Sequence, residues 1–564
     1  MKKNILLTAA ALLTTLAGAA QWQPAGDRIG TEWGEKLDPQ NVLPEYPRPQ
    51  MTRTQVQDGW QNLNGLWNYA ILPMGETPEK YDGQILVPFA VESSLSGVGK
   101  RLGNRNELWY NRTFTISPKW NGKRVLLHFG AVDQCCRVLV NDRPVGGHEG
   151  GYLPFTLDIT GALVPGENRL TVAVTDDPEG GVHAFGKQRT DRGGIWYTAQ
   201  SGIWQTVWME AVAPEALARV QMTTDIDQQQ LIVAPQFFRE SPNTLRVTLR
   251  DGGKVVGTRQ VRASNSSVVV IPVKKARLWS PEDPFLYDLT YEVVAPDGQV
   301  LDAVKSYVGM RKVHIEGNKI YLNNEPYYQR LVLDQGFYPD GIWTAPSDDA
   351  LRRDIELGLA AGFNGARLHQ KVFEERYYYW ADRLGYITWG ESPSWGMDAN
   401  DVETARNFLS EWAECVVRDR NHPSLLTWTP MNEEWWPDNT QFPRFASDVY
   451  DLTGRLDPTR PVNTVSGGAV VRTDIWAVHN YEQNPAKLKE KIFSDGTFFH
   501  PRLRTTRDQT RNIGFNEVKA TANYAWPQYD GSCPYLVDEF GGIKWVKDQE
   551  KQATDSQTES WGYG

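Results

Sequence analysis

Cysteine is scarce in this chain, which has 564 residues and contains Cys135, Cys136, Cys415 and Cys533. Four thiols in a chain of this length make no disulfide framework, and the adjacent Cys135 and Cys136 are poorly placed to bridge each other. No Cys/His cluster has the spacing of a zinc site. We therefore expect ordinary core thiols, and the sequence gives no reason to expect a metal site or a cofactor.

Long basic runs are also lacking, and the formal net charge is −10, so nucleic acid is not an expected partner. The apolar run Ile5–Leu16 is too short to span a bilayer. It follows Lys2 and Lys3 and precedes the small residues Ala17–Ala20, which is the pattern of a signal peptide over residues 1–20. This predicts a periplasmic or secreted protein without a membrane span.

The first part of the mature chain, residues 21–212, has the residue pattern of an all-β domain. Arg169–Val174 alternates polar and apolar residues, and Arg137–Val140 runs into the turn pair Asn141-Asp142. Short strands separated by Gly and Pro favour a jelly-roll β-sandwich. Residues 213–307 repeat this rhythm around the hairpin turn Asp251–Gly253, which predicts an immunoglobulin-like β-sandwich.

Residues 308–564 change to strand–helix alternation. Ser347 is a predicted N-cap, followed by the apolar stripe Leu351, Ile355 and Leu359. Seven short apolar strands are predicted, at Tyr328–Leu333, Asn364–Leu368, Tyr386–Trp389, Leu425–Thr429, Val462–Val465, Ile475–Val478 and Tyr535–Val537. This alternation predicts a (β/α)8 TIM barrel.

A barrel of this kind needs eight strands, and no convincing strand follows Gly541. An open barrel would leave two unpaired strand edges. We therefore expect a C-terminally truncated chain that lacks the last barrel strand. The alternative is an unrecognised extra strand near the start of this domain.

Two carboxylates stand at predicted strand ends. Glu433 follows the strand Leu425–Thr429, and Glu539 follows Tyr535–Val537. The C-terminal ends of barrel strands carry the chemistry in this fold, and two carboxylates there match the requirement of retaining glycoside hydrolysis. The neighbouring Glu434 and Asp538 are the alternative candidates. The chain also contains 22 Trp, a residue that stacks on sugars but also fills β-sandwich cores.

Several motifs resemble those of glycoside hydrolase family 2. They are Gln61–Trp67, Val87–Phe89, Leu108–Tyr110, Gly150–Phe155, Ser201–Gln205, Trp279–Glu282, Gly362–His369 and Asp419–Ser424, with Asn432-Glu433 the most specific. The resemblance covers nearly all of the chain after residue 20. It implies a jelly roll, an immunoglobulin-like domain and a TIM barrel in this order.

The resemblance also implies roles for individual residues. Glu433 matches the general acid/base and Glu539 the nucleophile, while Asn432 is expected to bind the hydroxyl beside the reacting carbon and Arg367 to steady the nucleophile. Other residues expected to contact the sugar are His369, His479, Tyr481, Asp334, Trp389 and Trp526. The implied partner is a glycoside or oligosaccharide, and a homo-oligomer is compatible with the sequence.

The resemblance leaves the terminal sugar open. An exo-acting β-galactosidase is the leading expectation, with β-glucuronidase and β-mannosidase as rivals, and a non-catalytic carbohydrate-binding protein as a rival of another class. The chain departs from common family patterns at His369-Gln370-Lys371 and Thr429-Pro430-Met431, both expected on the pocket rim. Lys371 is expected either to be a solvated rim lysine or to meet an acidic sugar.

Overall fold

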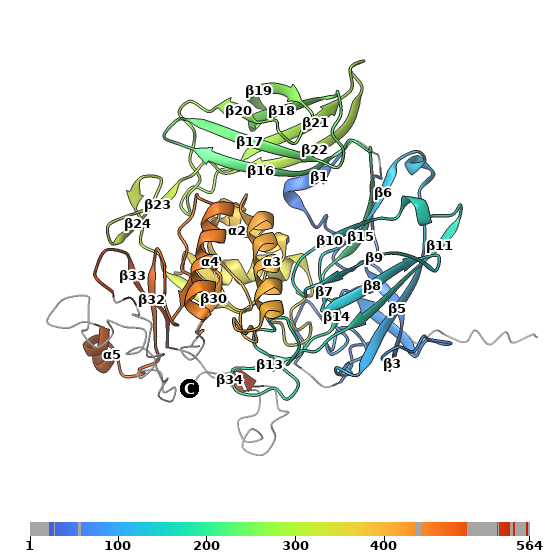
Figure 1. Ribbon diagram of the computed structural model, residues 1–564, viewed down its shortest axis with the longest axis horizontal. Coiled ribbons are helices and arrows are strands. Elements are labelled where there is room, and N and C mark those ends of the chain that lie inside the picture. The colour runs from blue at the N-terminus through green and yellow to red at the C-terminus, as the bar shows by residue number, and fades with distance from the viewer. Residues whose placement is uncertain are drawn as a thin grey trace, which may run out of the picture.

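The computed structural model describes residues 22–26, 29–54, 58–434, 441–492, 527 and 529–541, with two short strands beyond them. Figure 1 shows two β-sandwiches packed on adjoining sides of a mixed domain that carries the helices. The expected order of jelly roll, immunoglobulin-like sandwich and TIM-type barrel is confirmed. The predicted signal peptide and Trp526 lie outside the described residues.

The jelly roll is built from a six-stranded and a four-stranded sheet that enclose one apolar core. The larger sheet has the order β4 (Gly83–Val87), β3 (Gly65–Pro73), β5 (Asn106–Thr115), β11 (Glu167–Thr175), β8 (Cys135–Val140) and β9 (Arg143–Glu149). The smaller sheet has the order β10 (Phe155–Asp158), β6 (Arg124–Phe129), β15 (Val207–Val212) and β2 (Trp60–Asn62). Two short pairs complete the domain, β7 (Val132–Asp133) with β14 (Gly202–Ile203) and β12 (Gln188–Arg189) with β13 (Tyr197–Thr198).

The second sandwich pairs a five-stranded sheet with a three-stranded one. The first has the order β1 (Thr52–Arg53), β22 (Val300–Val308), β21 (Tyr287–Val294), β18 (Thr244–Asp251) and β19 (Lys254–Arg262). The second is β16 (Leu217–Asp225), β17 (Gln230–Phe237) and β20 (Val269–Pro272). Both predicted hairpins are confirmed: Asn141 and Asp142 each have positive φ between β8 and β9, and Gly252 has positive φ between β18 and β19.

Parallel strands and helices alternate in the barrel domain. The strands are β26 (Leu331–Asp334), β27 (Gly365–Leu368), β28 (Ile387–Glu391), β29 (Leu425–Thr429), β30 (Met431–Asn432), β31 (Val465–Ser466), β32 (Trp476–Asn480) and β33 (Tyr535–Phe540). The helices are α1 (Asp348–Ala360), α2 (Glu375–Leu384), α3 (Val402–Asp419), α4 (Phe442–Leu456) and α5 (Pro485–Ile492). All seven predicted strands overlap observed ones, and Ser347 caps α1 by accepting a hydrogen bond from the backbone N–H of Ala350.

The strand at the start of the barrel is shorter than expected, because β26 begins at Leu331 and Tyr328 is exposed. The strands that precede it, β23 (Val313–Glu316), β24 (Lys319–Leu322) and β25 (Glu325–Pro326), pair with one another antiparallel. They therefore do not supply an eighth parallel strand. Within the described ranges β33 pairs with β32 alone, and β34 (Trp545–Val546) pairs antiparallel with β35 (Ser560–Trp561).

Buried tryptophans account for much of the Trp content. Eight are almost completely buried, namely Trp67, Trp204, Trp208, Trp279, Trp343, Trp389, Trp412 and Trp428. They fill the cores and the contacts between domains, where a large apolar ring contributes most. The four cysteines, which all lie in described residues, are free thiols as expected.

Asp382 on α2 holds the immunoglobulin-like sandwich and the barrel together. Its buried carboxylate accepts hydrogen bonds from the hydroxyl of Tyr307 at 2.9 Å, Nδ1 of His422 at 2.6 Å and the backbone N–H of Ser424 at 3.0 Å. Its backbone carbonyl accepts from the indole of Trp279 at 2.7 Å. One aspartate thus joins the end of β22 to the loop that enters β29.

Replacing Asp382 by Ala should destabilise the protein by about 3–5 kcal/mol, because three buried donors lose their acceptor. The measurement is the midpoint of urea unfolding. Asp349→Ala on the exposed side of α1 is the control and should change the free energy of unfolding by less than about 1 kcal/mol. Equal midpoints for the two variants would contradict the role given to Asp382.

Candidate active site

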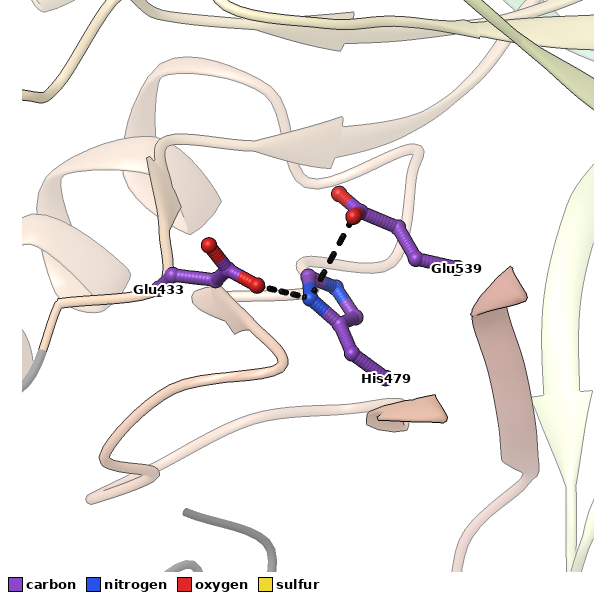
Figure 2. Close-up of side chains that lie close together, drawn as sticks. All are labelled: Glu433, His479 and Glu539. Carbon is purple, nitrogen blue, oxygen red and sulfur yellow. Dashed lines mark hydrogen bonds and ion pairs between the residues drawn. The ribbon is translucent and has the colours of Figure 1, made fainter. Parts of the chain in front are cut away.

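Glu433 and Glu539 lie together at the C-terminal end of the barrel strands. Figure 2 shows the two carboxylates with the ring of His479 between them. One oxygen of each carboxylate and one ring nitrogen of His479 all lie within 4.8 Å of one another. Nδ1 of His479 is 2.6 Å from Oε1 of Glu433 and 3.5 Å from Oε2 of Glu539. The structure thus brings three of the predicted site residues into one cluster.

Backbone irregularities at both strand ends aim these side chains. Glu433 has φ = +48°, a left-handed conformation unusual for a non-glycine residue, and its N–H donates to the carbonyl of Ser466 at 2.8 Å. In β33 the register with β32 shifts so that Val537 pairs with Val478 but Glu539 pairs with His479. Asp538 is therefore the extra residue of a β-bulge, a device that redirects side chains beside active sites.

The surroundings of Glu539 favour its ionised form. The side chain is buried, which by itself would raise the pKa of the carboxyl, but His479, Arg367 and Lys187 supply positive charge and lower the pKa to about 2. The guanidinium of Arg367 and the hydroxyl of Tyr481 both donate hydrogen bonds to the carboxylate. A group held in this way is a carboxylate at neutral pH.

His479 connects the two carboxylates. Burial opposes its protonation, but the charges of Glu539 and Glu433 outweigh burial and raise the pKa of the imidazole to about 9. Its other ring nitrogen lies 2.9 Å from the hydroxyl of Ser466, which in turn donates to Asp538 at 2.6 Å. Nδ1 of His479 thus faces Glu433, whereas Nε2 faces Ser466 and Asp538 on the opposite side of the ring.

Arg367 on β27 binds a carboxylate that sequence reasoning missed. Its guanidinium donates to Oε2 of Glu391 at 2.6 Å, and Oε1 of Glu391 lies 2.8 Å from Nδ1 of His369. Burial, partly offset by Arg367, raises the pKa of Glu391 to about 7. Burial and nearby cations, including Lys187, hold the pKa of His369 well below its usual value. The available signal was that Glu391, like Glu433 and Glu539, ends a barrel strand.

Asn432 presents an amide to the same cluster. Its Oδ1 accepts from Arg367 at 3.1 Å, and its side chain is 1% exposed. Its Nδ2 is buried and has no hydrogen-bond acceptor among the described residues. This donor is therefore available to a ligand oxygen that enters the cluster.

The other two described residues of the predicted set, Asp334 and Trp389, hydrogen-bond to groups outside the carboxylate pair. Asp334 accepts from the hydroxyl of Tyr377 at 3.0 Å. Trp389 lies two residues before Glu391 on β28. It packs in a small apolar core with Val313, Ile320 and Ile387, and its indole donates to Gln329 at 2.8 Å. The expectation that Lys371 is a solvated rim lysine is wrong, because Lys371 is 1% exposed and donates to two backbone carbonyls.

The trio Glu433, His479 and Glu539 also has the spacing to hold a metal ion. A metal ion would have to bind Nδ1 of His479, the nitrogen that faces Glu433. Because the pKa of this imidazole is raised to about 9, binding would require the loss of its proton. The donor set therefore fits a proton-sharing cluster better than a metal site. None of the helices in the described ranges combines the length and apolar character that crossing a bilayer requires.

Comparison with protein families gives three consecutive matches. Residues 77–210 match the sugar-binding domain of glycosyl hydrolases family 2, residues 216–311 match glycosyl hydrolases family 2, and residues 313–506 match the TIM barrel domain of that family. Together these matches cover most of the chain.

Individual relatives agree with the family matches. A β-glucuronidase of Paenibacillus borealis is 28% identical in an alignment 459 residues long that covers 74% of each chain. A β-galactosidase of Thermoanaerobacter pseudethanolicus is 26% identical over 63% of this chain but only 48% of its own length. Among solved structures, the β-glucuronidase of Ruminococcus gnavus with D-glucuronic acid has a TM-score of 0.70 at 20% identity, covering 90% of this chain and 86% of that one. The domain order, the strand-end carboxylates and these matches show that the chain belongs to glycoside hydrolase family 2 and is a glycosidase.

Proposed function

We propose that this protein is an exo-acting retaining β-glycosidase in which Glu539 is the nucleophile and Glu433 the general acid/base. The observation that carries the proposal is the approach of their carboxylate oxygens to within 4.8 Å. Retaining enzymes place the two carboxyls about 5–5.5 Å apart, whereas inverting enzymes need about 6.5–9.5 Å to fit a water between them. The spacing here suits direct attack by a carboxylate.

The reaction then has two displacements. Glu539 attacks the anomeric carbon while the bond to the leaving oxygen breaks, and Glu433 gives that oxygen its proton. In the second step Glu433 takes a proton from water, the water oxygen attacks the same carbon, and the bond to Glu539 breaks. Nδ2 of Asn432 offers a donor to a sugar hydroxyl, and Arg367 holds Glu539 in position.

For the terminal sugar we favour a β-glucuronide over the β-galactoside that the motifs suggested. The first relative named above is a β-glucuronidase, and so are two solved structures of similar fold, from Ruminococcus gnavus and Dictyoglomus thermophilum. β-Galactosidases are also among the relatives, so the two sugars are tested against each other.

A panel of nitrophenyl β-glycosides tests this ranking. We expect kcat/KM for the β-glucuronide to exceed that for the β-galactoside and the β-mannoside by at least about tenfold, or about 1.4 kcal/mol. Proton NMR of the first-formed sugar should show the β-anomer. A faster galactoside or mannoside would overturn the choice of sugar, and binding without cleavage of any substrate would favour the carbohydrate-binding alternative.

We also propose that the protein is exported to the periplasm or secreted, on the basis of the signal-peptide pattern in residues 1–20. The N-terminal sequence of the protein purified from its native cells tests this. A start close to residue 21 is expected, and retention of Met1 in a cytosolic fraction would refute it.

A further inference from the structure

The ring of His479 is held in one orientation by its neighbours. His479 lies in β32, is 2% exposed, and pairs with Glu539 of β33 where the register shifts. Gly467, directly after β31, has φ = +62°, and a Cβ there would lie 2.5 Å from three atoms of the imidazole. The chain can pack this closely against the ring only with glycine at that position, and the contact restricts how the ring can turn.

Ser466 contacts both His479 and Glu433. Its backbone carbonyl accepts from the N–H of Glu433 at 2.8 Å. Its hydroxyl oxygen lies 2.9 Å from Nε2 of His479, and the hydroxyl donates to Oδ2 of Asp538 at 2.6 Å. A serine hydroxyl has a single proton to donate. Because that proton is directed at Asp538, Ser466 accepts from His479, and Nε2 of His479 therefore carries a proton.

This assignment determines what lies between His479 and Glu433. Nδ1 is 2.6 Å from Oε1 of Glu433, and a hydrogen bond between a nitrogen and a carboxyl oxygen requires one proton between them. With the proton on Nδ1 the pair is an imidazolium and a carboxylate, and with the proton on Oε1 it is a neutral imidazole and a carboxylic acid. The side chain of His479 is fully buried whereas that of Glu433 is 9% exposed, so the proton reaches a substrate through Glu433.

We propose that Glu433 shares its proton with His479, and that this pair rather than Glu433 alone supplies the proton of the first displacement. The inference rests on Glu433 being the general acid/base. His479 is a positioning residue in this scheme, because it acts on the substrate only through Glu433, and Ser466 in turn positions His479.

The protons balance over the two displacements. As Glu539 attacks the anomeric carbon and the bond to the leaving oxygen breaks, the shared proton passes from the carboxyl of Glu433 to that oxygen. This leaves a carboxylate beside an imidazole that is protonated on Nε2 alone. In the second displacement a water gives a proton to Glu433 while the water oxygen bonds to the carbon and the bond to Glu539 breaks, which restores the shared proton.

Two groups that share one proton titrate as a unit. Burial opposes the charge on the imidazole, but the charges of the carboxylates outweigh burial and raise its pKa to about 9. The pair therefore keeps its proton at a pH where an isolated carboxyl group would have lost it. The titratable groups around the imidazole come from, or directly follow, the ends of β27, β30, β32 and β33, and they are His369, Glu433, Tyr481, Asp538 and Glu539.

The test compares His479→Asn with the wild type, because the asparagine amide can still donate to Glu433 but has no proton to release. The substrate is an alkyl β-glycoside of whichever sugar the protein hydrolyses. The basic limb of its kcat/KM profile should lie about two pH units lower in His479→Asn. A dinitrophenyl glycoside needs no proton on its leaving group, so its profile at neutral and alkaline pH should show no such shift. His314→Asn on β23, outside the barrel site, is the matched control and should keep the limb of the wild type.

The outcomes separate this inference from the proposed function. If Glu433→Ala slows the alkyl and dinitrophenyl substrates equally, the acid/base assignment falls and this inference falls with it. If Glu433→Ala distinguishes the two leaving groups but His479→Asn lowers the rate at every pH with an unmoved limb, His479 is merely structural and only this inference is overturned. Should His479→Asn not fold, Ser466→Ala decides the question. It removes the acceptor of Nε2 and should lower the limb by about one pH unit, whereas an unmoved limb overturns the inference.

Discussion

Glu539→Gln should reduce kcat/KM for any nitrophenyl β-glycoside on the order of 10⁴-fold or more, because the amide cannot form the glycosyl-enzyme bond. The variant keeps the size of the side chain. It removes the carboxylate, which accepts hydrogen bonds from Arg367 and Tyr481 and attracts the imidazolium of His479. The measurement is steady-state hydrolysis at neutral pH, where the low pKa of Glu539 keeps the wild-type carboxylate ionised.

Asp538→Asn is the matched control, since Asp538 is the adjacent carboxylate on the same bulged strand. Asp538 accepts from Ser466 at 2.6 Å and lies 3.5 Å from the far nitrogen of His479, so its loss should weaken the support of His479 without removing the nucleophile. We expect a decrease smaller by at least about tenfold than that of Glu539→Gln. The reverse order would transfer the nucleophile role to Asp538.

Glu433→Ala should have an effect that depends on the leaving group. For an alkyl or sugar leaving group, which must be protonated as it departs, we expect kcat/KM to fall by about 10²–10⁴-fold. For a dinitrophenyl leaving group the first displacement should be little changed, so that the glycosyl-enzyme accumulates and shows as a burst. This split distinguishes a lost acid/base from a general loss of structure.

Azide provides the second half of this test. The small anion fits the space left by the Glu433 side chain and needs no general base, so it should attack the glycosyl-enzyme and give a β-glycosyl azide with restored turnover. Glu434→Ala, which removes the neighbouring buried carboxylate, is the control and should show no azide product. Rescue of Glu434→Ala and not of Glu433→Ala would reassign the acid/base.

Strands and turns followed from local patterns in this chain. The seven barrel strands were found because short apolar runs alternate with amphipathic helices. Asn141 and Asp142 formed the predicted hairpin turn because their side chains tolerate positive φ. Boundaries were less well determined, as at Tyr328, where β-type residues precede the observed start of β26 at Leu331.

Long-range charge contacts were not predictable in this way. The β-bulge at Asp538 depends on register with β32, and register is a property of a pair of strands. Lys371, read as a rim residue from its place after β27, is instead buried against two carbonyls that the loop after β26 brings to it. The position of Glu391 at a strand end could have marked it as a site residue. Its pairing with Arg367 and His369 could not be predicted from the local sequence.

By itself the sequence determined which side chains are available and which ends of the barrel strands carry them, because strand and helix periods are local and the family motifs are contiguous. Only the tertiary structure decided the ionisation of those side chains. The charge on Glu539 depends on Arg367, His479 and Lys187, which come from two other barrel strands and a separate sandwich. Electrostatic energy depends on distance in space and on burial, and neither is set until the domains have packed.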